Sequence, residues 1–355
     1  MITKNFWNKK RVLVTGHTGF KGSWLSIWLK ILKVNLVGYA LPPLTPSLFN
    51  LANVADGMRS IEGDIRDLNH VTTFLQENSP EIVIHMAAQA LVVKSHENPH
   101  ETYTTNVLGT LNILEAVRQI DSVKVLIIVT SDKCYQNKEW VWGYREYDNL
   151  GGSDPYSNSK ACAELITSAY RDSYFNNPKS SFNHVSVATV RAGNVLGGGD
   201  WAENRLIPDV MQSLISGHQV KIRNPKSIRP WQFVLEPLCG YLLLVEHLWN
   251  HGIEYAEEWN FGPNDTENQS VCWIVERLDK LWGTKLGWQE LPQPYPHEAN
   301  NLRLDCSKAN QKLHWTPKLN LSTTLEWVVE WYKCYDNNGN IEELTRKQII
   351  EFQNL

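Results

Sequence analysis

Short apolar runs rich in β-branched residues alternate with longer amphipathic stretches along the first half of the chain. The short runs predict strands, at 11–15, 35–40, near 61, 82–85, 125–129 and 184–191. The longer stretches repeat apolar residues at helical spacing and predict helices, at 22–33, 68–78, 103–117 and 155–174. Strands that are regularly followed by helices are typical of a parallel sheet covered on both faces. We therefore predict an α/β fold with a doubly wound parallel sheet of the Rossmann type.

The pattern changes after about residue 192. A glycine-rich loop at 197–200 is followed by two further predicted helices, at 206–215 and 238–249, with short strand-like segments between them. The run Glu258-Trp259-Asn260-Phe261-Gly262 is predicted to return a strand to the sheet. This second half is expected to form a smaller α+β unit.

The length of 355 residues suits one large domain or two closely joined domains. We expect a Rossmann domain over residues 1–191 and a smaller domain over residues 192–355. Since a strand is predicted to rejoin the sheet, segments near 229–262 are expected to return to the first domain. The sequence assigns no role to residues 331–355.

Composition excludes several classes of protein. The formal net charge of -4 gives no electrostatic case for binding nucleic acid. No apolar stretch reaches the length of a membrane span or a signal peptide, so we expect a cytoplasmic protein. The six cysteines are widely spaced and the histidines do not cluster, which predicts reduced thiols and no metal site. Of the fifteen tryptophans, four lie beside polar loops and could shape a ligand pocket, namely Trp140, Trp142, Trp201 and Trp231.

A glycine-rich turn lies between the first predicted strand and the first predicted helix. Gly16, Gly19 and Gly22 are spaced three apart there, which allows a tight turn and close approach to a pyrophosphate at the helix N-terminus. The second strand ends in Ala40-Leu41-Pro42, without the acidic residue that often binds the adenosine ribose. No basic residue stands there for a 2′-phosphate either. We therefore predict that NAD binds and that it is released readily.

Two further sets of side chains can move protons. Tyr156 and Lys160 are four residues apart, on one face of a predicted helix, and a lysine cation near a phenol favours the phenolate. A phenolate can take a proton from a hydroxyl group while hydride leaves the same carbon. The tetrad Thr130-Ser131-Asp132-Lys133 closes an apolar strand, and ligands gather at the carboxyl ends of such strands. Together these groups predict redox chemistry coupled to removal of water.

The chain resembles the extended short-chain dehydrogenase/reductase family in five motifs, which follow in the family's order: TGHTGFKG at 15–22, GDIRD at 63–67, HMAAQA at 85–90, TNVLGT at 105–110 and YSNSK at 156–160. The resemblance implies that Thr18 and Phe20 bind the cofactor together with the three glycines. Further implied cofactor contacts are Asp64 and Ile65 at the adenine and Ala87, Ala88 and Gln89 along the NAD path. It also implies that Asn106 lies below the site and that Lys160 bonds the nicotinamide ribose.

Within this family the chain is similar to the nucleotide-sugar 4,6-dehydratases, and to the subgroup that acts on CDP-glucose. The similar segments lie at 16–25, 130–146, 191–209 and 228–237. Lys133 stands where most of these enzymes have Glu, which fits the subgroup and makes Lys133 the candidate base. The resemblance implies NAD-dependent conversion of CDP-D-glucose to CDP-4-dehydro-6-deoxy-D-glucose and water.

The implied mechanism gives each group a role. Tyr156 takes the proton of the C4 hydroxyl while hydride passes to NAD. The 4-ketone makes the C5 proton acidic, Lys133 removes it, and Asp132 protonates the departing C6 oxygen. Ser131 is the hydroxyl residue beside this pair. Hydride then returns to C6, so the cofactor is regenerated in each turnover.

The substrate is expected to be held by Arg229 at the diphosphate and by Asn194, Arg205 and Leu206, with His297 as a further candidate. Residues alone do not fix the nucleobase. Alternatives are a dehydratase or 4-epimerase of a dTDP-, GDP- or UDP-linked sugar and, more remotely, an NAD-sensing protein without catalysis. The resemblance also implies a homodimer or homotetramer, paired through helices around 100–120 and 156–174, and a role in deoxysugar supply for O-antigen and lipopolysaccharide.

Overall fold

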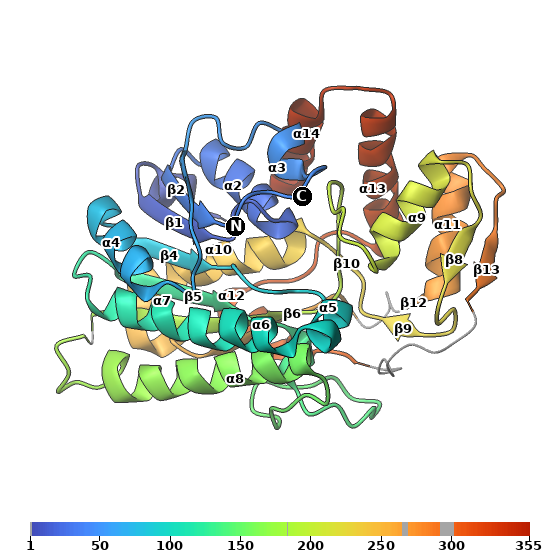
Figure 1. Cartoon of the computed structure of the whole chain (residues 1–355). Coiled ribbons are helices and arrows are strands. Elements are labelled where there is room, and N and C mark those ends of the chain that lie inside the picture. The colour runs from blue at the N-terminus through green and yellow to red at the C-terminus, as the bar shows by residue number, and fades with distance from the viewer. Residues whose placement is uncertain (1, 183, 265–268, 292–301) are drawn as a thin grey trace.

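A parallel sheet forms the centre of the molecule (Figure 1). The computed structural model describes residues 2–182, 184–264, 269–291 and 302–355. The seven strands of the sheet have the order β11-β6-β5-β4-β1-β2-β3. They are β1 (Arg11–Thr15), β2 (Asn35–Ala40), β3 (Arg59–Glu62), β4 (Ile82–His85), β5 (Val125–Val129), β6 (Ser186–Ala192) and β11 (Glu258–Phe261). All neighbouring strands pair in parallel, which confirms the predicted fold class.

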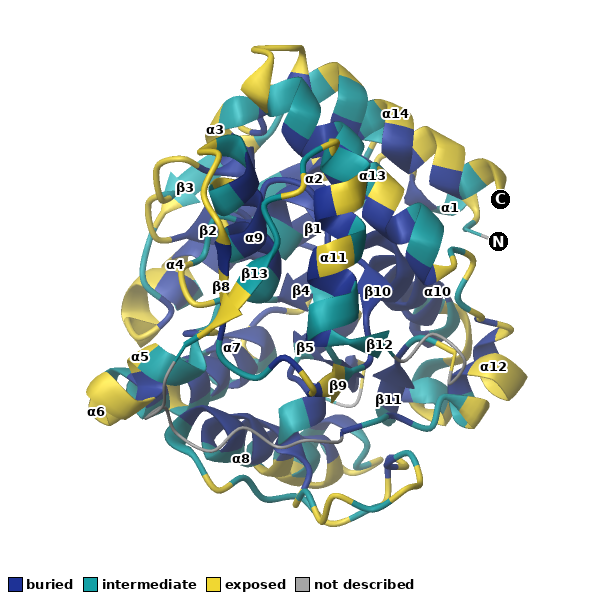
Figure 2. Cartoon of the chain, turned by 90° about the vertical axis from the view of Figure 1, so that its right-hand side faces the viewer, coloured by how far each residue is buried: buried dark blue, intermediate teal, exposed yellow. Residues whose placement is uncertain are grey.

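Helices cover both faces of the sheet because its strands are apolar on both sides. In β1, Val12 and Val14 pack into one core and Leu13 into the other, as the two-residue period of a strand requires. One face carries α2 (Phe20–Ile31) and α10 (Leu235–His251), and the other carries α4 (Leu68–Asn78), α7 (Gly109–Arg118) and α8 (Pro155–Tyr170). Figure 2 shows the buried strands β1, β4 and β5 enclosed by helices whose outer faces are exposed.

The second half of the chain forms a smaller group of elements beside the carboxyl ends of the strands (Figure 1). Its helices are α9 (Leu206–Ile215), α11 (Val271–Trp282) and α13 (Leu321–Asp336), whereas α12 (Ser307–Leu313) packs on α10 and β11 of the large sheet. Its short strands are β7 (Val195–Leu196), β8 (Val220–Ile222), β9 (Ile228–Arg229), β10 (Gln232–Phe233), β12 (Gln269–Ser270) and β13 (Trp288–Glu290). The remaining short helices are α1 (Lys4–Trp7), α3 (Leu48–Leu51), α5 (Val92–Glu97) and α6 (Pro99–Tyr103).

The final helix, α14 (Ile341–Asn354), packs against α2 on the large sheet. Phe352 meets Trp28 edge to face, with 5.8 Å between ring centroids. The last residues therefore help to cover one face of the sheet, a role that the sequence did not indicate. Within the residues that the structure describes, we find no helix with both the length and the apolar character needed to cross a bilayer.

Several predicted bounds agree with the structure and others differ for local reasons. The helices predicted at 68–78 and 206–215 have those bounds. The helix predicted over 103–117 is divided by a π turn at Thr104–Leu108, and the helix predicted over 155–174 ends in another at Arg171–Phe175. The helix predicted from residue 238 begins at Leu235, because Pro237 fits the first turn of a helix, where its missing N–H is not needed.

Candidate active site

A cleft of about 850 Å³ lies between the carboxyl ends of the strands and the smaller group of elements. Its walls come from the turn after β1, the ends of β4 and β5, the first turns of α8, the loop after β6, and α9. The following predicted site residues line it: Gly16, Thr18, Gly19, Phe20, Gly22, Asp64, Ile65, Ala87, Ala88, Gln89, Ser131, Asp132, Lys133, Tyr156, Lys160, Asn194, Arg205, Leu206 and Arg229. Asn106 lies behind the wall, and His297 lies outside the described residues.

The glycine-rich turn packs so tightly that two of its positions leave no room for a side chain. Gly16 has a φ of +74°, and a Cβ there would lie 2.7 Å from the backbone nitrogen of Ala87. A Cβ on Gly22 would lie 2.1 Å from the carbonyl oxygen of Gly16. Helix α2 begins directly after this turn without a side-chain cap, so its first N–H groups can bind an anion. The turn thus has the geometry of a pyrophosphate cradle.

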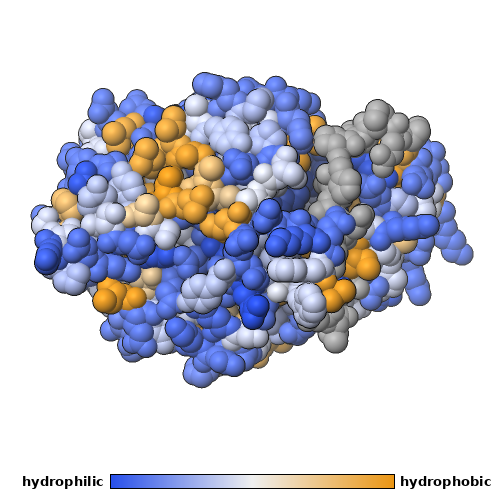
Figure 3. Space-filling model, turned by 90° about the horizontal axis from the view of Figure 1, so that it is seen from below, coloured by the Kyte–Doolittle hydropathy of each residue, from blue (hydrophilic) through white to orange (hydrophobic). Residues whose placement is uncertain are grey.

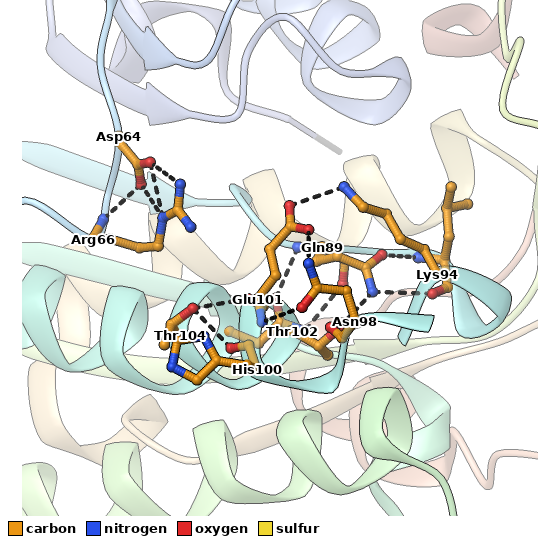
Figure 4. A network of polar contacts seen from close by, with 11 residues as sticks. Asp64, Arg66, Gln89, Lys94, Asn98, His100, Glu101, Thr102 and Thr104 are labelled. Carbon is orange, nitrogen blue, oxygen red and sulfur yellow. Dashed lines mark hydrogen bonds and ion pairs between the residues drawn. The ribbon is translucent and has the colours of Figure 1, made fainter. Parts of the chain in front are cut away.

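Asn106 holds the opposite wall of the cleft in place. Its Nδ2 donates to the carbonyl oxygen of Gln89 at 3.0 Å and to Oγ of Ser159 at 2.8 Å, and its Oδ1 accepts from the Gln89 N–H at 2.8 Å. Gln89 is also bonded to Thr102, as Figure 4 shows. The side chain of Asn106 therefore ties the loop after β4 to α8.

Asp64 lies at the edge of the cleft and is paired with Arg66 (Figure 4). The guanidinium donates from Nε to both carboxylate oxygens, at 3.0 and 2.9 Å, and the backbone N–H of Arg66 donates at 2.9 Å. The hydrogen bonds from the Arg66 side chain lower the pKa of Asp64. An ionised carboxylate at this position can accept from an exocyclic amine.

The side chains of the tetrad at the end of β5 lie in two different environments. The hydroxyl of Thr130 points away from the cleft and donates to Glu164. Ser131 donates to Oδ1 of Asp132 at 3.0 Å and accepts from the N–H of Lys133 at 3.2 Å. Burial raises the pKa of the Asp132 carboxyl, and the charge of Lys133 opposes this. Asp132 is thus held in a setting that favours its protonated form.

Tyr156 and Lys160 lie on the first two turns of α8, as the spacing predicted. The Nζ of Lys160 donates to the carbonyl oxygen of Val129 at 3.2 Å, and burial lowers its pKa to about 8. Burial raises the pKa of the Tyr156 phenol to about 12, and a hydrogen bond with Ser131 is the largest effect in the opposite direction. We expected Lys160 to lower the pKa of Tyr156, but in the structure it is the hydrogen bond with Ser131 that lowers it.

Basic side chains face the cleft from the smaller group of elements. Arg205, at the N-terminus of α9, bonds Asp200 at 3.0 Å. Burial lowers the pKa of the Arg205 guanidinium, but the charge of Asp200 and its hydrogen bond raise this pKa by more. Arg229 lies on β9, which pairs with β12. The backbone carbonyl oxygen of Asn194 accepts a hydrogen bond from the N–H of Gln232 at 3.1 Å. These cations suit a substrate that carries phosphate groups.

Lys21 is a cleft residue that our sequence reasoning missed. Its Nζ donates to the hydroxyl of Tyr241 on α10 at 3.0 Å. Burial lowers the pKa of Lys21 to about 7, and the nearby charges of Lys160 and Arg205 add to this. The signal in the sequence was a lysine inside the glycine-rich turn, where a cation next to a helix N-terminus can meet an anion.

The tryptophan prediction was correct in one case of four. Trp231 lines the cleft and is buried. Trp201 packs instead against aromatic rings of α13, including Tyr335 at 4.7 Å between centroids. Trp140 packs on Tyr144, and Trp142 is 69% exposed.

Comparisons with known proteins agree with this geometry. The family model described as GDP-mannose 4,6 dehydratase matches residues 13–328. A CDP-glucose 4,6-dehydratase of Salmonella typhimurium is 51% identical over 353 residues, covering 99% of this chain and 98% of the relative. A dTDP-glucose 4,6-dehydratase of Xanthomonas campestris is 27% identical, covering 90% of this chain and 92% of the relative.

Solved structures share the fold. A double mutant of DesIV, a dTDP-glucose 4,6-dehydratase from Streptomyces venezuelae, with NAD and DAU bound, matches with a TM-score of 0.80 at 22% identity, covering 94% of this chain and 99% of that one. A UDP-glucose 4-epimerase of Thermotoga maritima matches with a TM-score of 0.79 at 22% identity, covering 91% and 99%. From the family model and the Salmonella relative, the chain belongs to the GDP-mannose 4,6 dehydratase family, among the nucleotide-sugar dehydratases of the short-chain dehydrogenase/reductase type.

Proposed function

We propose that this protein uses NAD to convert CDP-D-glucose to CDP-4-dehydro-6-deoxy-D-glucose and water. The observation that carries the proposal is the meeting of Tyr156 and Lys160 with Ser131, Asp132 and Lys133 in one cleft. A 4-epimerase needs the first pair but not an acid and a base beside it. The choice of CDP-glucose rests on the 51% identity to the Salmonella CDP-glucose 4,6-dehydratase.

The residues present fit NAD. The cradle around Gly16 and Gly22 admits backbone contact with a pyrophosphate, and Ala87 and Ala88 leave the adjoining wall without bulky side chains. When bound, NAD would supply the hydride acceptor for oxidation at C4 of the sugar and the hydride donor for reduction at C6. Lys160 and Tyr156 are placed by α8 to bond the ribose and the reacting hydroxyl, respectively, which is the role that we propose for them.

The proton steps can be assigned to this chain's own groups. Tyr156 takes the C4 hydroxyl proton, and Ser131, bonded to the phenol, supports the charge that forms. Catalysis then needs a deprotonated Tyr156 and a protonated Lys160. Activity should therefore rise with pH up to the pKa of Lys160, about 8, and level off above it, because the gain in Tyr156 phenolate is then matched by the loss of the Lys160 cation.

Asp132 and Lys133 share the dehydration step. A base at C5 must be a neutral lysine, and an acid at the C6 oxygen must be a protonated carboxyl. Transfer of one proton from Lys133 to Asp132 turns the two charged groups into this reactive pair without any change in total charge. The buried position of Asp132 favours that transfer, since burial raises its pKa.

The test compares CDP-glucose with dTDP-glucose and UDP-glucose as substrates. NMR of the products should show a 4-keto-6-deoxy sugar from CDP-glucose and little conversion of the others. A 4-epimerase would instead give the galactose epimer. With tritium at C4 of glucose, the label should appear in the product's methyl group, and an unlabelled methyl group would disprove the proposed hydride path.

Replacing Gly22 with Ala should destabilise the protein by about 1–3 kcal/mol and abolish NAD binding, because the new Cβ collides with the Gly16 carbonyl. Gly19→Ala is the matched control for the effect on stability, since a Cβ there meets only the Gly16 carbonyl, at 3.4 Å. Calorimetry and NAD titration measure both effects. A Gly22→Ala protein with the wild-type melting temperature and NAD affinity would contradict the packing argument.

NAD affinity should fall as pH rises above about 7, by up to about tenfold per pH unit. The anionic pyrophosphate favours the ammonium form of Lys21, which is lost above its pKa of about 7. Lys21→Met should bind NAD more weakly at pH 6 and show a flat pH dependence. Isothermal titration of both proteins between pH 6 and 9 measures this, and equal slopes would exclude Lys21 as the cause.

We propose further that NAD exchanges freely, because the tip of β2 offers Ala40 and Leu41 rather than a carboxylate to the adenosine ribose. Enzyme that has been dialysed extensively should then need added NAD. Full activity without added NAD would contradict this proposal.

The arrangement of the chain supports three broader proposals. We assign NAD to residues 1–191 and the nucleotide sugar to 192–355, with segments near 229–262 belonging to the sheet.

A homodimer or homotetramer through the face of α7 and α8 is supported by apolar side chains there (Figure 3), among them Leu165, which is 58% exposed. Light scattering of wild type and Leu165→Lys tests it. A cytoplasmic role in deoxysugar supply for O-antigen and lipopolysaccharide follows from the proposed product.

A further inference from the structure

A buried carboxylate lies directly behind the candidate active site. Glu164 is on α8, and its side chain is 1% exposed. It accepts hydrogen bonds from Nε and Nη2 of Arg191 on β6, at 2.9 and 2.8 Å, from Thr189 at 2.6 Å, and from Thr130. Four donors from two strands therefore hold this one carboxylate.

Arg191 extends the network past the tetrad. Its Nη1 donates to the hydroxyl of Tyr135 at 2.7 Å and to the carbonyl oxygen of Glu146 at 2.9 Å. Tyr135 lies two residues after the tetrad and donates in turn to Asn260 of β11 at 2.8 Å. The polar groups that meet at Arg191 thus join the loop after β5 to both of the next strands in the sheet.

Glu164 also continues a series of contacts between α8 and the end of β5. Tyr156, Lys160 and Glu164 are spaced four apart and share one face of the helix. Lys160 bonds the carbonyl oxygen of Val129, the Thr130 hydroxyl bonds Glu164, and Ser131 bonds Tyr156. Three successive residues of the strand end are thereby attached to three successive turns of the helix.

We propose that Glu164 is a positioning residue, which fixes α8 against β5 so that Tyr156 and Lys160 stay in register with Ser131, Asp132 and Lys133. Glu164 does not line the cleft, so it would act through these residues. The inference rests on the proposed dehydratase function, because it concerns the relative placement of the two groups that this reaction needs.

The charge of Glu164 adds to its geometric role. Burial lowers the pKa of Lys160, while Glu164 and the Cys134 thiol raise it. The other titratable groups that face Lys160 are His85 on β4 and Lys21 on α2. Loss of the Glu164 charge should lower the pKa of Lys160 further, so the pH at which activity stops rising should move to a lower value.

The test uses two variants that separate position from charge. Glu164→Gln removes the charge and should lower kcat by about 10- to 100-fold, with KM for CDP-glucose changed by less than about twofold and the rise of activity with pH ending at a lower pH. Thr130→Val keeps the charge and removes the hydroxyl that contacts Glu164 and the carbonyl oxygen of Val190. It should lower kcat by about three- to tenfold without moving the pH at which activity stops rising.

Glu258→Gln is the matched control. Glu258 pairs with Arg171, just beyond the C-terminus of α8, so it also joins this helix to the sheet, but neither residue lines the cleft. This variant should keep the kcat and pH profile of the wild type. Folded fraction is measured for every variant by circular dichroism, and rates are given per folded molecule.

The possible results are distinct. If wild type does not convert CDP-glucose, the proposed function fails first. If wild type is active and both Thr130→Val and folded Glu164→Gln keep its kcat and pH profile, the positioning role is wrong. If Glu164→Gln does not fold, a wild-type kcat in Thr130→Val overturns the role, and a reduced kcat supports it. A loss in Glu258→Gln equal to that in Glu164→Gln would also overturn it, because the effect would then come from general stability.

Discussion

Replacing Tyr156 with Phe is expected to lower the rate of C4 oxidation by about 10³-fold, because the variant lacks the group that takes the hydroxyl proton. Tyr156 is buried at the start of α8, and its phenol is bonded to Ser131. Loss of the hydroxyl leaves the volume of the side chain almost unchanged, so the fold should be kept. Single-turnover measurement of cofactor reduction isolates this step, since the reduced cofactor absorbs where the oxidised form does not.

Tyr103→Phe is a matched control for Tyr156→Phe. The hydroxyl of Tyr103 donates to Asn158 on α8 at 2.9 Å, but Tyr103 does not line the cleft. Its variant should reduce the cofactor at close to the wild-type rate. Reduction at the wild-type rate in Tyr156→Phe would remove Tyr156 from the role of base, and an equal loss in both variants would indicate a general effect on α8.

The sheet and the position of the cleft could be predicted because both depend on local pattern. The strands predicted at 11–15, 35–40, 82–85 and 125–129 have those bounds in the structure. Their apolar runs are continuous because both faces of the sheet are covered. Once the strands are parallel, their carboxyl ends meet at one edge, so residues that directly follow them, such as Ser131 and Asp132, were placed correctly at the cleft.

Contacts between distant segments could not be predicted in this way. Glu164 and Arg191 are 27 residues apart and form an ion pair within the core, where sequence patterns give no sign of pairing. Lys21 meets Tyr241 across 220 residues, so neither its burial nor its lowered pKa could be foreseen from the turn alone. The direction of the Thr130 hydroxyl, away from the cleft, likewise depends on Glu164.

The packing of α14 on α2 is a further case. The sequence of α14 is amphipathic, which predicts a helix with a buried face but not the partner of that face. Trp28 and Phe352 meet only because the chain returns across the molecule. Likewise, tryptophans beside polar loops were expected at a ligand pocket, but large aromatic residues gain as much from packing on one another, as Trp201 does on Tyr335.

Replacing Lys133 with Met is expected to reduce solvent deuterium exchange at C5 by about 10²-fold or more while C4 oxidation remains detectable. Met keeps the length of the side chain and removes the amine that would take the C5 proton. The charge of Lys133 opposes the rise in the pKa of Asp132, so its removal should leave Asp132 more strongly protonated and still able to act as an acid. Product NMR in deuterated water reports exchange, and single-turnover cofactor reduction reports C4 oxidation.

The Lys221→Met variant is a control that distinguishes loss of the base from loss of a positive charge in the cleft. Lys221 lies on β8 and also lines the cleft, but it comes from the side opposite the tetrad. Its variant is expected to raise KM for CDP-glucose and to keep the wild-type deuterium content at C5. If Lys133→Met also incorporates deuterium at the wild-type rate, another group removes the C5 proton. Asp132 is the other titratable side chain of the tetrad, so it would then be the base and Lys133 the acid. Asp132→Asn would in that case abolish the incorporation of deuterium at C5.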